Sequence, residues 1–239
     1  MPPVVRLRSA VCLLGRFPAL AGVDLDVAEG EVVLLSGGNG AGKTTLLRLL
    51  AGLVPLRSGS AWVLGHDLAE DPKSHRRLLS LVGHETGCYD DLTVAENVRF
   101  AARAAGADAP PEQEVLQQFG LTPLCDVVHA RLSAGQRRRL AFAIAMVRTP
   151  QLLLLDEPHA GLDAEGRAAL AAVLAGSPSA GRSVVLVSHE LERSRPLSSR
   201  EVVLTAGQAH GTLPDPERAE TKDSRPTLAR GATPSGSRA

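Results

Sequence analysis

This sequence contains few aromatic residues, few cysteines and no excess of either charge. Aromatics make up 3% of the 239 residues, although 44% of the residues are apolar, so we expect a core built mainly from Leu, Val and Ala. The three cysteines, Cys12, Cys88 and Cys125, are scattered and show no C-x-x-C spacing. Neither a disulfide framework nor a zinc site follows from them, and a reducing cytoplasm fits this usage best.

The even balance of charge weighs against nucleic acid as a partner. Lys+Arg and Asp+Glu both number 26, which gives a formal net charge of zero. Proteins that bind DNA or RNA usually carry a basic excess. We therefore expect no nucleic-acid partner.

Long hydrophobic runs are missing as well. The segment at residues 1–8 contains no apolar run long enough for a signal peptide. The most apolar window, residues 151–155, is far too short to span a bilayer. If the protein acts at a membrane, another chain must cross it.

Short apolar runs alternating with helical patterns predict a parallel α/β fold. Residues 31–36 read as a strand buried on both faces, a Gly-rich loop follows, and a helix over 43–50 stops at Gly52. Strand, loop and helix in this order form half of a parallel α/β unit. Further strands are predicted at 4–7, 23–27, 61–64, 152–155, 184–187 and 201–205, with a helix at 163–175.

Between residues 85 and 149 the pattern becomes helical. Three helices are predicted, at about 93–105, 110–120 and 134–147. The first begins with Thr93 and Glu96 at the spacing of a capping box. We expect a nucleotide-binding core at 1–84 and 150–213, a helical subdomain at 85–149, and a disordered tail at 214–239, where aliphatic residues are almost absent.

Residues 37–44 carry the first chemical motif. The segment GGNGAGKT matches G-x-x-x-x-G-K-[ST], whose backbone N–H groups cradle phosphates at a helix N-terminus. Lys43 would reach the β- and γ-phosphates of ATP, and the Thr44 hydroxyl would bind Mg²⁺. An ordinary Gly-rich turn is the alternative, which the position between a buried strand and a helix disfavours. The predicted cofactor-binding residues are Gly37, Gly38, Asn39, Gly40, Ala41, Gly42, Lys43, Thr44 and Thr45.

Two carboxylates and a histidine form the second group. The strand at 152–155 leads into Asp156, which suits Mg²⁺, and Glu157, which suits a general base worth roughly 10²–10⁴ in rate. His189 follows the strand at 184–187 and is placed to hydrogen-bond a γ-phosphate. Alone, the two carboxylates would indicate a solvated turn and His189 an ordinary surface or core histidine. After a phosphate loop the catalytic interpretation is favoured.

The segment LSAGQ at residues 132–136 opens the third predicted helix. Ser133 and Gln136 have capping-box spacing, and a capped helix start also presents N–H groups to a phosphate. The spacing does not choose between these two roles. The arginines at 137–139 indicate a solvated helix face, and Asp163 is a natural N-cap for the next helix.

In order and spacing across residues 4–210, these motifs resemble the ABC ATPase family, whose distinguishing element is the LSAGQ-type signature. The resemblance implies a P-loop core with an inserted helical subdomain and a head-to-tail homodimer in the ATP-bound state. Ser133, Gly135 and Gln136 of one subunit would cap the ATP held by the other. Asp163 would signal across the interface and His189 would sense the γ-phosphate. A separate integral membrane subunit would carry the cargo, so the chain would lie on the inner face of the cell membrane.

Two positions depart from the family pattern. Glu85 stands where the family usually has a Gln that touches Mg²⁺ and the attacking water, and a carboxylate can still ligate Mg²⁺. The family stacks adenine on an aromatic residue, and the matching position here is Leu14. Phe17 is the nearby aromatic that we expect to substitute.

The family also implies that residues 85–93, between core and insertion, dock the membrane subunit. Cys88 and Tyr89 suit such a docking loop, unless they pack under the insertion. Within the family, 83–84, 89–93, 96–97 and Ala134 are most similar to the ATP-binding subunit of the haem exporter of cytochrome c maturation.

Several alternatives stay open. One is an ATPase of another ABC exporter, for a drug or a lipid. A non-transport ABC protein is disfavoured by the single ATPase unit and the lack of a long heptad run. A P-loop kinase or GTPase would have no use for LSAGQ, and a regulatory module that barely hydrolyses ATP would not need the complete catalytic set.

Overall fold

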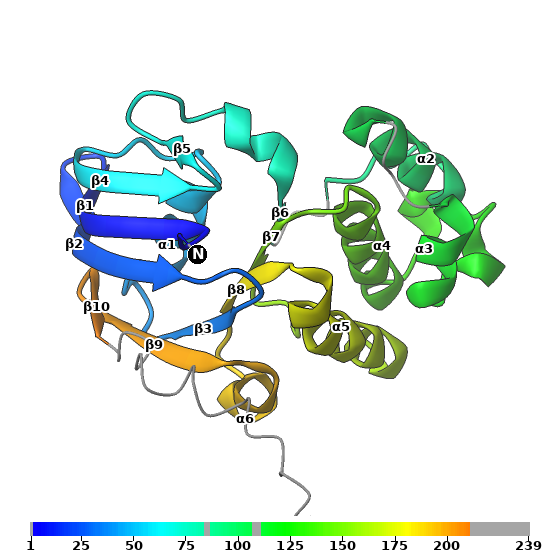
Figure 1. Ribbon diagram of the computed structural model, residues 1–239. Coiled ribbons are helices and arrows are strands. Elements are labelled where there is room, and N and C mark those ends of the chain that lie inside the picture. The colour runs from blue at the N-terminus through cyan, green and yellow to red at the C-terminus, as the bar shows by residue number, and fades with distance from the viewer. Residues whose placement is uncertain (1, 84–86, 107–110, 211–239) are drawn as a thin grey trace, which may run out of the picture.

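The computed structural model describes residues 2–83, 87–106 and 111–210. These residues form two β-sheets with helices between and beside them (Figure 1). The predicted α/β class is therefore confirmed. Residues 214–239, predicted to be a disordered tail, lie outside the described residues.

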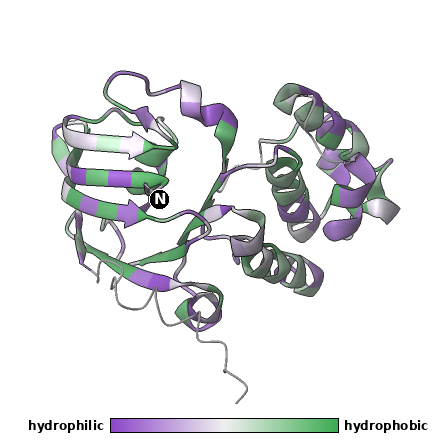
Figure 2. Cartoon of the chain, viewed as in Figure 1, coloured by the Kyte–Doolittle hydropathy of each residue, from purple (hydrophilic) through white to green (hydrophobic). Residues whose placement is uncertain are grey.

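The first sheet is antiparallel and has the order β2-β1-β4-β5. Its strands are β1 (Val5–Leu14), β2 (Phe17–Val27), β4 (Ser58–Val63) and β5 (His66–Asp67). Strand β1 extends beyond the predicted 4–7. Its register shifts after Leu7, where Ser9 has a positive φ of 47°. This shift breaks the alternation of apolar residues by which a strand is predicted. In Figure 2 hydrophilic and hydrophobic residues alternate along these strands, as in a sheet with one solvated face.

The second sheet has the order β10-β9-β3-β8-β7-β6, and all its strands except β10 are parallel. Its strands are β3 (Val32–Ser36), β6 (Leu79–Val82), β7 (Leu152–Asp156), β8 (Ser183–Val187), β9 (Arg200–Thr205) and β10 (Gln208–His210). Every residue of β3, β7 and β8 is buried. Their carboxyl ends meet at one edge, where α/β proteins bind ligands.

Strand β6 was not predicted. Its sequence, LSLV, is interrupted by Ser80, whose polarity hides the apolar run. Ser80 is nevertheless buried, because its Oγ donates a hydrogen bond of 3.0 Å to the carbonyl of Ala145. A helix far along the chain thus satisfies a polar group that the local sequence leaves unexplained.

The core divides into two layers on the faces of the parallel sheet. Helix α1 (Lys43–Leu50) lies in the layer shared with the antiparallel sheet, which also receives Val33 and Leu35. The alternate residues, Val32 and Leu34, enter the layer that holds the other helices. This alternation follows from the two-residue period of a strand.

Helices fill the second layer and extend it to one side (Figure 1). They are α2 (Val94–Ala105), α3 (Glu112–Gln118), α4 (Ala134–Val147) and α5 (Ala164–Gly176), and a short α6 (Leu191–Ser194) follows β8. Short 3-10 helices occur at Ser74–Leu78, Thr122–Leu124, His129–Arg131, Pro178–Ala180 and Arg195–Leu197. The helices predicted at 93–105, 134–147 and 163–175 are all present. Among the described residues no helix is both long and apolar enough to cross a bilayer.

Candidate nucleotide-hydrolysis site

The loop after β3 depends on glycine at two positions. Gly37 and Gly42 have φ values of 138° and 103°, which L side chains rarely adopt. A Cβ at Gly37 would lie 2.2 Å from the carbonyl oxygen of Leu204, and one at Gly42 would lie 2.4 Å from that of Ala19. The loop therefore passes against the backbones of β9 and β2, as a phosphate cradle requires.

Lys43 begins α1 and is almost completely buried. Its Nζ donates hydrogen bonds of 2.7 Å to the carbonyl of Gly37 and 3.0 Å to that of Gly38. The ammonium is thereby held across the loop, at a helix start whose first turn carries no acidic residue. Positive charge from the side chain and from the helix end thus converges where an anion would bind.

Thr44 and Asp156 come together from α1 and the end of β7. The Thr44 hydroxyl donates a hydrogen bond of 2.9 Å to Oδ2 of Asp156, which is buried. A hydroxyl and one carboxylate beside a phosphate loop fit Mg²⁺, which proteins usually bind through one or two carboxylates plus substrate phosphates and waters.

Glu157 and His189 are in contact at the same edge. Glu157 Oε2 accepts a hydrogen bond of 3.1 Å from the backbone N–H of His189, and Glu157 Oε1 lies 3.4 Å from the ring Nε2 of His189. The backbone of Glu157 is left-handed, with φ of 50°, and its N–H donates 2.9 Å to the carbonyl of Val187. Such a conformation costs on the order of 1–3 kcal/mol in a non-glycine residue, and it clusters at functional sites.

A cavity of about 400 Å³ unites these groups. It is lined by Leu14, Ala19, Asn39, Gly40, Ala41, Gly42, Lys43, Thr44, Thr45, Asp156, Glu157, Val187 and His189. Most of the predicted loop residues and both carboxylates thus share one cavity with His189. Gly37 and Gly38 contribute through the carbonyls that hold Lys43.

The residues that line this cavity leave two predicted contacts untested. Phe17 pairs with Leu14 at the end of the β1–β2 hairpin and is 79% exposed. Leu14, and not Phe17, is among the described residues that line the cavity. Stacking of adenine on Phe17 therefore stays a prediction. Glu85 lies outside the described residues, and its role toward Mg²⁺ also stays a prediction.

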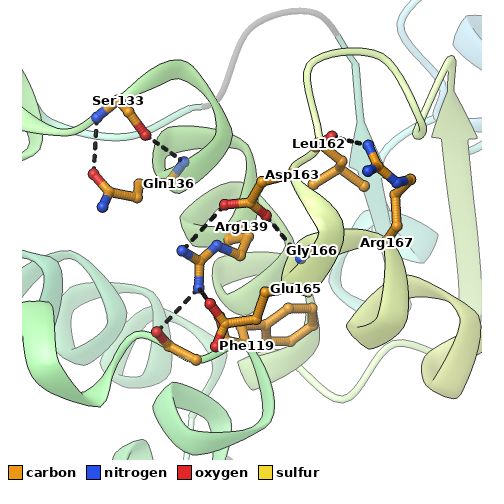
Figure 3. A network of polar contacts seen from close by, with 10 residues as sticks. Phe119, Ser133, Gln136, Arg139, Leu162, Asp163, Glu165, Gly166 and Arg167 are labelled. Carbon is orange, nitrogen blue, oxygen red and sulfur yellow. Dashed lines mark hydrogen bonds and ion pairs between the residues drawn. The ribbon is translucent and has the colours of Figure 1, made fainter.

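The signature segment forms the predicted capping box at the start of α4 (Figure 3). Ser133 N–H donates 2.9 Å to Oε1 of Gln136, and Gln136 N–H donates 3.3 Å to Oγ of Ser133. Gly135 packs so closely against Asp163 that a Cβ would lie 3.3 Å from its Oδ2. Among the described residues that line the cavity, none comes from this segment.

The expectation of a solvated face at 137–139 is wrong for Arg138 and Arg139, which are both buried. Arg139 donates 2.8 Å to Glu165 and 2.9 Å to the carbonyl of Phe119, and it pairs with Asp163 at 3.3 Å (Figure 3). The missed signal is that the rest of α4 is apolar almost all round, so that every face of the helix enters the core.

Comparison with known proteins agrees with this geometry. The family described as ABC transporter matches residues 20–160. The cytochrome c biogenesis ATP-binding export protein CcmA of Bordetella bronchiseptica is 43% identical over 185 residues, covering 77% of this chain and 83% of that protein.

Solved structures share the fold over most of the chain. The ATP-binding subunit of an ABC transporter gives a TM-score of 0.81 at 29% identity, covering 90% of this chain and 92% of that one. A dimeric ATP-binding cassette in a post-hydrolysis state, bound to ADP and Pi, gives 0.77 at 24% identity, covering 87% and 97%. The chain therefore belongs to the ABC transporter family and is an ATPase subunit of that family.

Proposed function

We propose that this subunit hydrolyses ATP to drive transport through a separate membrane chain, with haem exported for cytochrome c maturation as the cargo. The contact of Glu157 with His189, beside the Thr44–Asp156 pair, carries the hydrolytic part. The cargo is supported by the Bordetella relative, which is named for export in cytochrome c biogenesis.

The residues of the cavity divide the reaction between them. Lys43 and the loop N–H groups bind the β- and γ-phosphates, while Thr44 and Asp156 would hold Mg²⁺, which neutralises phosphate charge when bound. Glu157 accepts a proton from a water whose oxygen attacks the γ-phosphorus, and the bond to the ADP oxygen breaks. His189, held against Glu157, donates to the γ-phosphate and orients the base.

A second copy of the chain completes each site. Ser133, Gly135 and Gln136 lie outside the cavity that holds the loop of their own chain. In a head-to-tail homodimer they would cap the γ-phosphate on the partner, with the N-terminus of α4 directed at the anion. Closure would be passed to a membrane subunit at the inner face of the cell membrane.

The substitution Glu157→Gln tests the hydrolytic part. The amide cannot accept the proton, so we expect ATP to bind with unchanged affinity while turnover falls roughly 10²-fold or more. Sedimentation with ATP should then show a lasting dimer that the wild type forms only transiently. Normal hydrolysis by a monomeric variant would remove Glu157 from the role of base.

The cargo needs a separate experiment. In cells that lack this chain, we expect c-type cytochromes, detected by covalent haem staining, to disappear and to return with the wild-type gene but not with the Glu157→Gln gene. Unchanged c-type cytochromes would reject haem export and leave the ATPase assignment intact. Purification of the membrane protein that binds the chain would then identify another cargo.

A further inference from the structure

Arg138 is a buried cation aimed at the backbone behind the two catalytic carboxylates. Its side chain leaves α4 four residues before Phe142, and its guanidinium carbon lies 5.4 Å from the centre of that ring. Only 7% of Arg138 is exposed. In the described part of the chain no carboxylate is hydrogen-bonded to it, which sets it apart from Arg139 with its two acidic partners.

Backbone carbonyls take the place of a carboxylate. Arg138 Nη1 donates to the carbonyl of Gly83, and Nη2 donates 3.2 Å to that of Asp156 and 3.1 Å to that of Glu157. Burial lowers the pKa of the Arg138 guanidinium, and the nearby Asp156 charge opposes that shift. Burying a cation without a hydrogen-bonded counter-ion is costly. Hydrogen bonds to three carbonyls therefore do not, by stability alone, explain an arginine at this position.

The third carbonyl belongs to a strained residue. Glu157 has φ of 50°, its N–H is bound to the carbonyl of Val187, and its carboxylate is bound to His189. Arg138 binds the peptide on the other side of the same Cα. The left-handed conformation that directs the Glu157 side chain toward His189 is thereby held from both ends.

We propose that Arg138 is a positioning residue for Glu157, which fixes the backbone at the end of β7 so that the carboxylate meets the attacking water. The proposal rests on the proposed function, in which Glu157 is the base. Arg138 also stands on the helix that begins with the signature segment. Helix α4 therefore links two sites: Ser133 at its start would contact ATP bound to the partner, and Arg138 orients Glu157 of the same chain as Ser133.

The test separates positioning from stability by measuring kcat, KM, ATP affinity and Tm for three variants. Arg138→Gln removes the guanidinium that binds the three carbonyls. We expect kcat to fall about tenfold or more, since a small misplacement of a catalytic group can lower the rate up to about 10²-fold. KM and the Kd for ATP should stay within about threefold, because the phosphate loop is untouched. Arg138→Lys, with one compact ammonium, should recover only part of the loss.

Arg182→Gln is the matched control. Arg182 is half-buried, burial lowers the pKa of its guanidinium as it does for Arg138, and its Nε donates a hydrogen bond of 3.2 Å to the carbonyl of Pro150. It precedes β8, at the end of the sheet away from the cavity. We expect a similar change in Tm with kcat within about twofold of wild type.

The outcomes are distinguishable from failure of the proposed function. If Glu157→Gln abolishes turnover but Arg138→Gln keeps it, or loses no more than Arg182→Gln, the positioning role is rejected. A loss in Arg138→Gln that appears wholly in ATP affinity would also reject it. Normal turnover by Glu157→Gln would instead reject the base itself, whatever Arg138 does.

Discussion

At the scale of single residues, Lys43 shows how a buried charge is prepared for a ligand. Its ammonium is satisfied by two loop carbonyls, but these are neutral acceptors that leave the positive charge uncompensated. A phosphate chain entering the loop would supply that compensation. The cost of keeping Lys43 in the loop is thus repaid when nucleotide binds.

The substitution Lys43→Ala removes this charge. Because it is the loop's only side-chain cation, we expect ATP affinity or turnover to fall by roughly tenfold or more. Arg48→Ala is the control, since Arg48 is an exposed cation on the same helix. Equilibrium binding and phosphate release measure both quantities, and activity within twofold of wild type in Lys43→Ala would reject the loop as the phosphate site.

His75 predicts a pH dependence of stability. It is fully buried, and its Nε2–H donates 2.9 Å to the carbonyl of Leu50. Burial, the largest cause, lowers its pKa from 6.5, helped by His66 and Arg76 and opposed by the Leu50 hydrogen bond and Asp71. The unfolded chain therefore binds this proton more readily, and the stability that His75 contributes is present above about pH 6.5 and is lost as the pH falls.

We therefore expect the Tm of the wild type to fall more between pH 7.5 and pH 5.5 than that of His75→Gln. In a domain of this size each kcal/mol corresponds to about 2–4 °C. The glutamine keeps a donor for Leu50 but does not titrate. Parallel pH profiles for the two proteins would show that His75 does not control acid stability.

At the scale of elements, the central strands that carry the site were predictable from the sequence, and the short strands at the two edges of the same sheet were not. Strands β3, β7 and β8 are buried on both faces, so each reads as an unbroken apolar run. Strand β6 contains Ser80, and β10 has three residues and pairs only at the edge of the sheet. Their strand conformation depends on partners distant in sequence, which no local pattern contains.

The candidate site divides in the same way. Glycines, Lys43 and the paired carboxylates carry their chemistry in local motifs, and parallel strands bring those motifs to one edge. The apolar sequence of α4 could have indicated that Arg138 is buried, but its carbonyl partners emerge only from the packing of α4 against the end of β7. Leu14 was assigned to the adenine position by resemblance, and the structure places it on the cavity wall.

The loop before α2 is the element proposed to dock the membrane subunit. The buried Asn97 accepts 2.8 Å from the Tyr89 N–H and donates 3.1 Å to its carbonyl, which fixes the backbone. The Tyr89 side chain stays 52% exposed, edge-on to Phe100 with ring centres 5.0 Å apart. Cys88 instead packs against the core. Tyr89 is therefore the residue to test.

We expect Tyr89→Glu to spare ATPase activity and Tm in the isolated subunit but to weaken binding to membranes that contain the partner, because a charge would enter the docking contact. Trp62→Glu places the same charge on another exposed aromatic, on the antiparallel sheet, and should leave binding unchanged. Lost ATPase activity would show that Tyr89 supports the fold. Equal binding by both variants would move the docking surface elsewhere.

At the scale of the whole molecule, the proposed dimer assigns the two halves of each site to different chains. The phosphate loop, Asp156 and Glu157 would come from one subunit and the signature segment from the other. Two chains damaged in different halves should therefore complement each other. In a mixed dimer one site would receive both defects, and the other site would receive none.

The pair Lys43→Ala and Ser133→Asp makes this test. Asp caps a helix as well as Ser does, so α4 keeps its N-cap while a negative charge faces the partner's γ-phosphate. Each variant alone should be nearly inactive. In an equal mixture half of the dimers are mixed and each has one intact site, so we expect activity to return to about a quarter of wild type, as two-fold symmetry requires.

Mixing Lys43→Ala with Glu157→Gln is the control, because both defects lie on the phosphate-loop half. Each site of every dimer then contains one damaged residue of its own chain, and no activity should return. Recovery in this control would mean that the catalytic groups are divided between the chains in some other way.

The Ser133→Asp mixture could also fail to recover activity, although differently tagged chains show that mixed dimers are present. Ser133 would then act within its own subunit, or both sites would have to be intact for either to turn over. Measurement of the ATP retained per mixed dimer separates these two results. If each site is built from both chains, the one intact site of a mixed dimer would still trap one nucleotide.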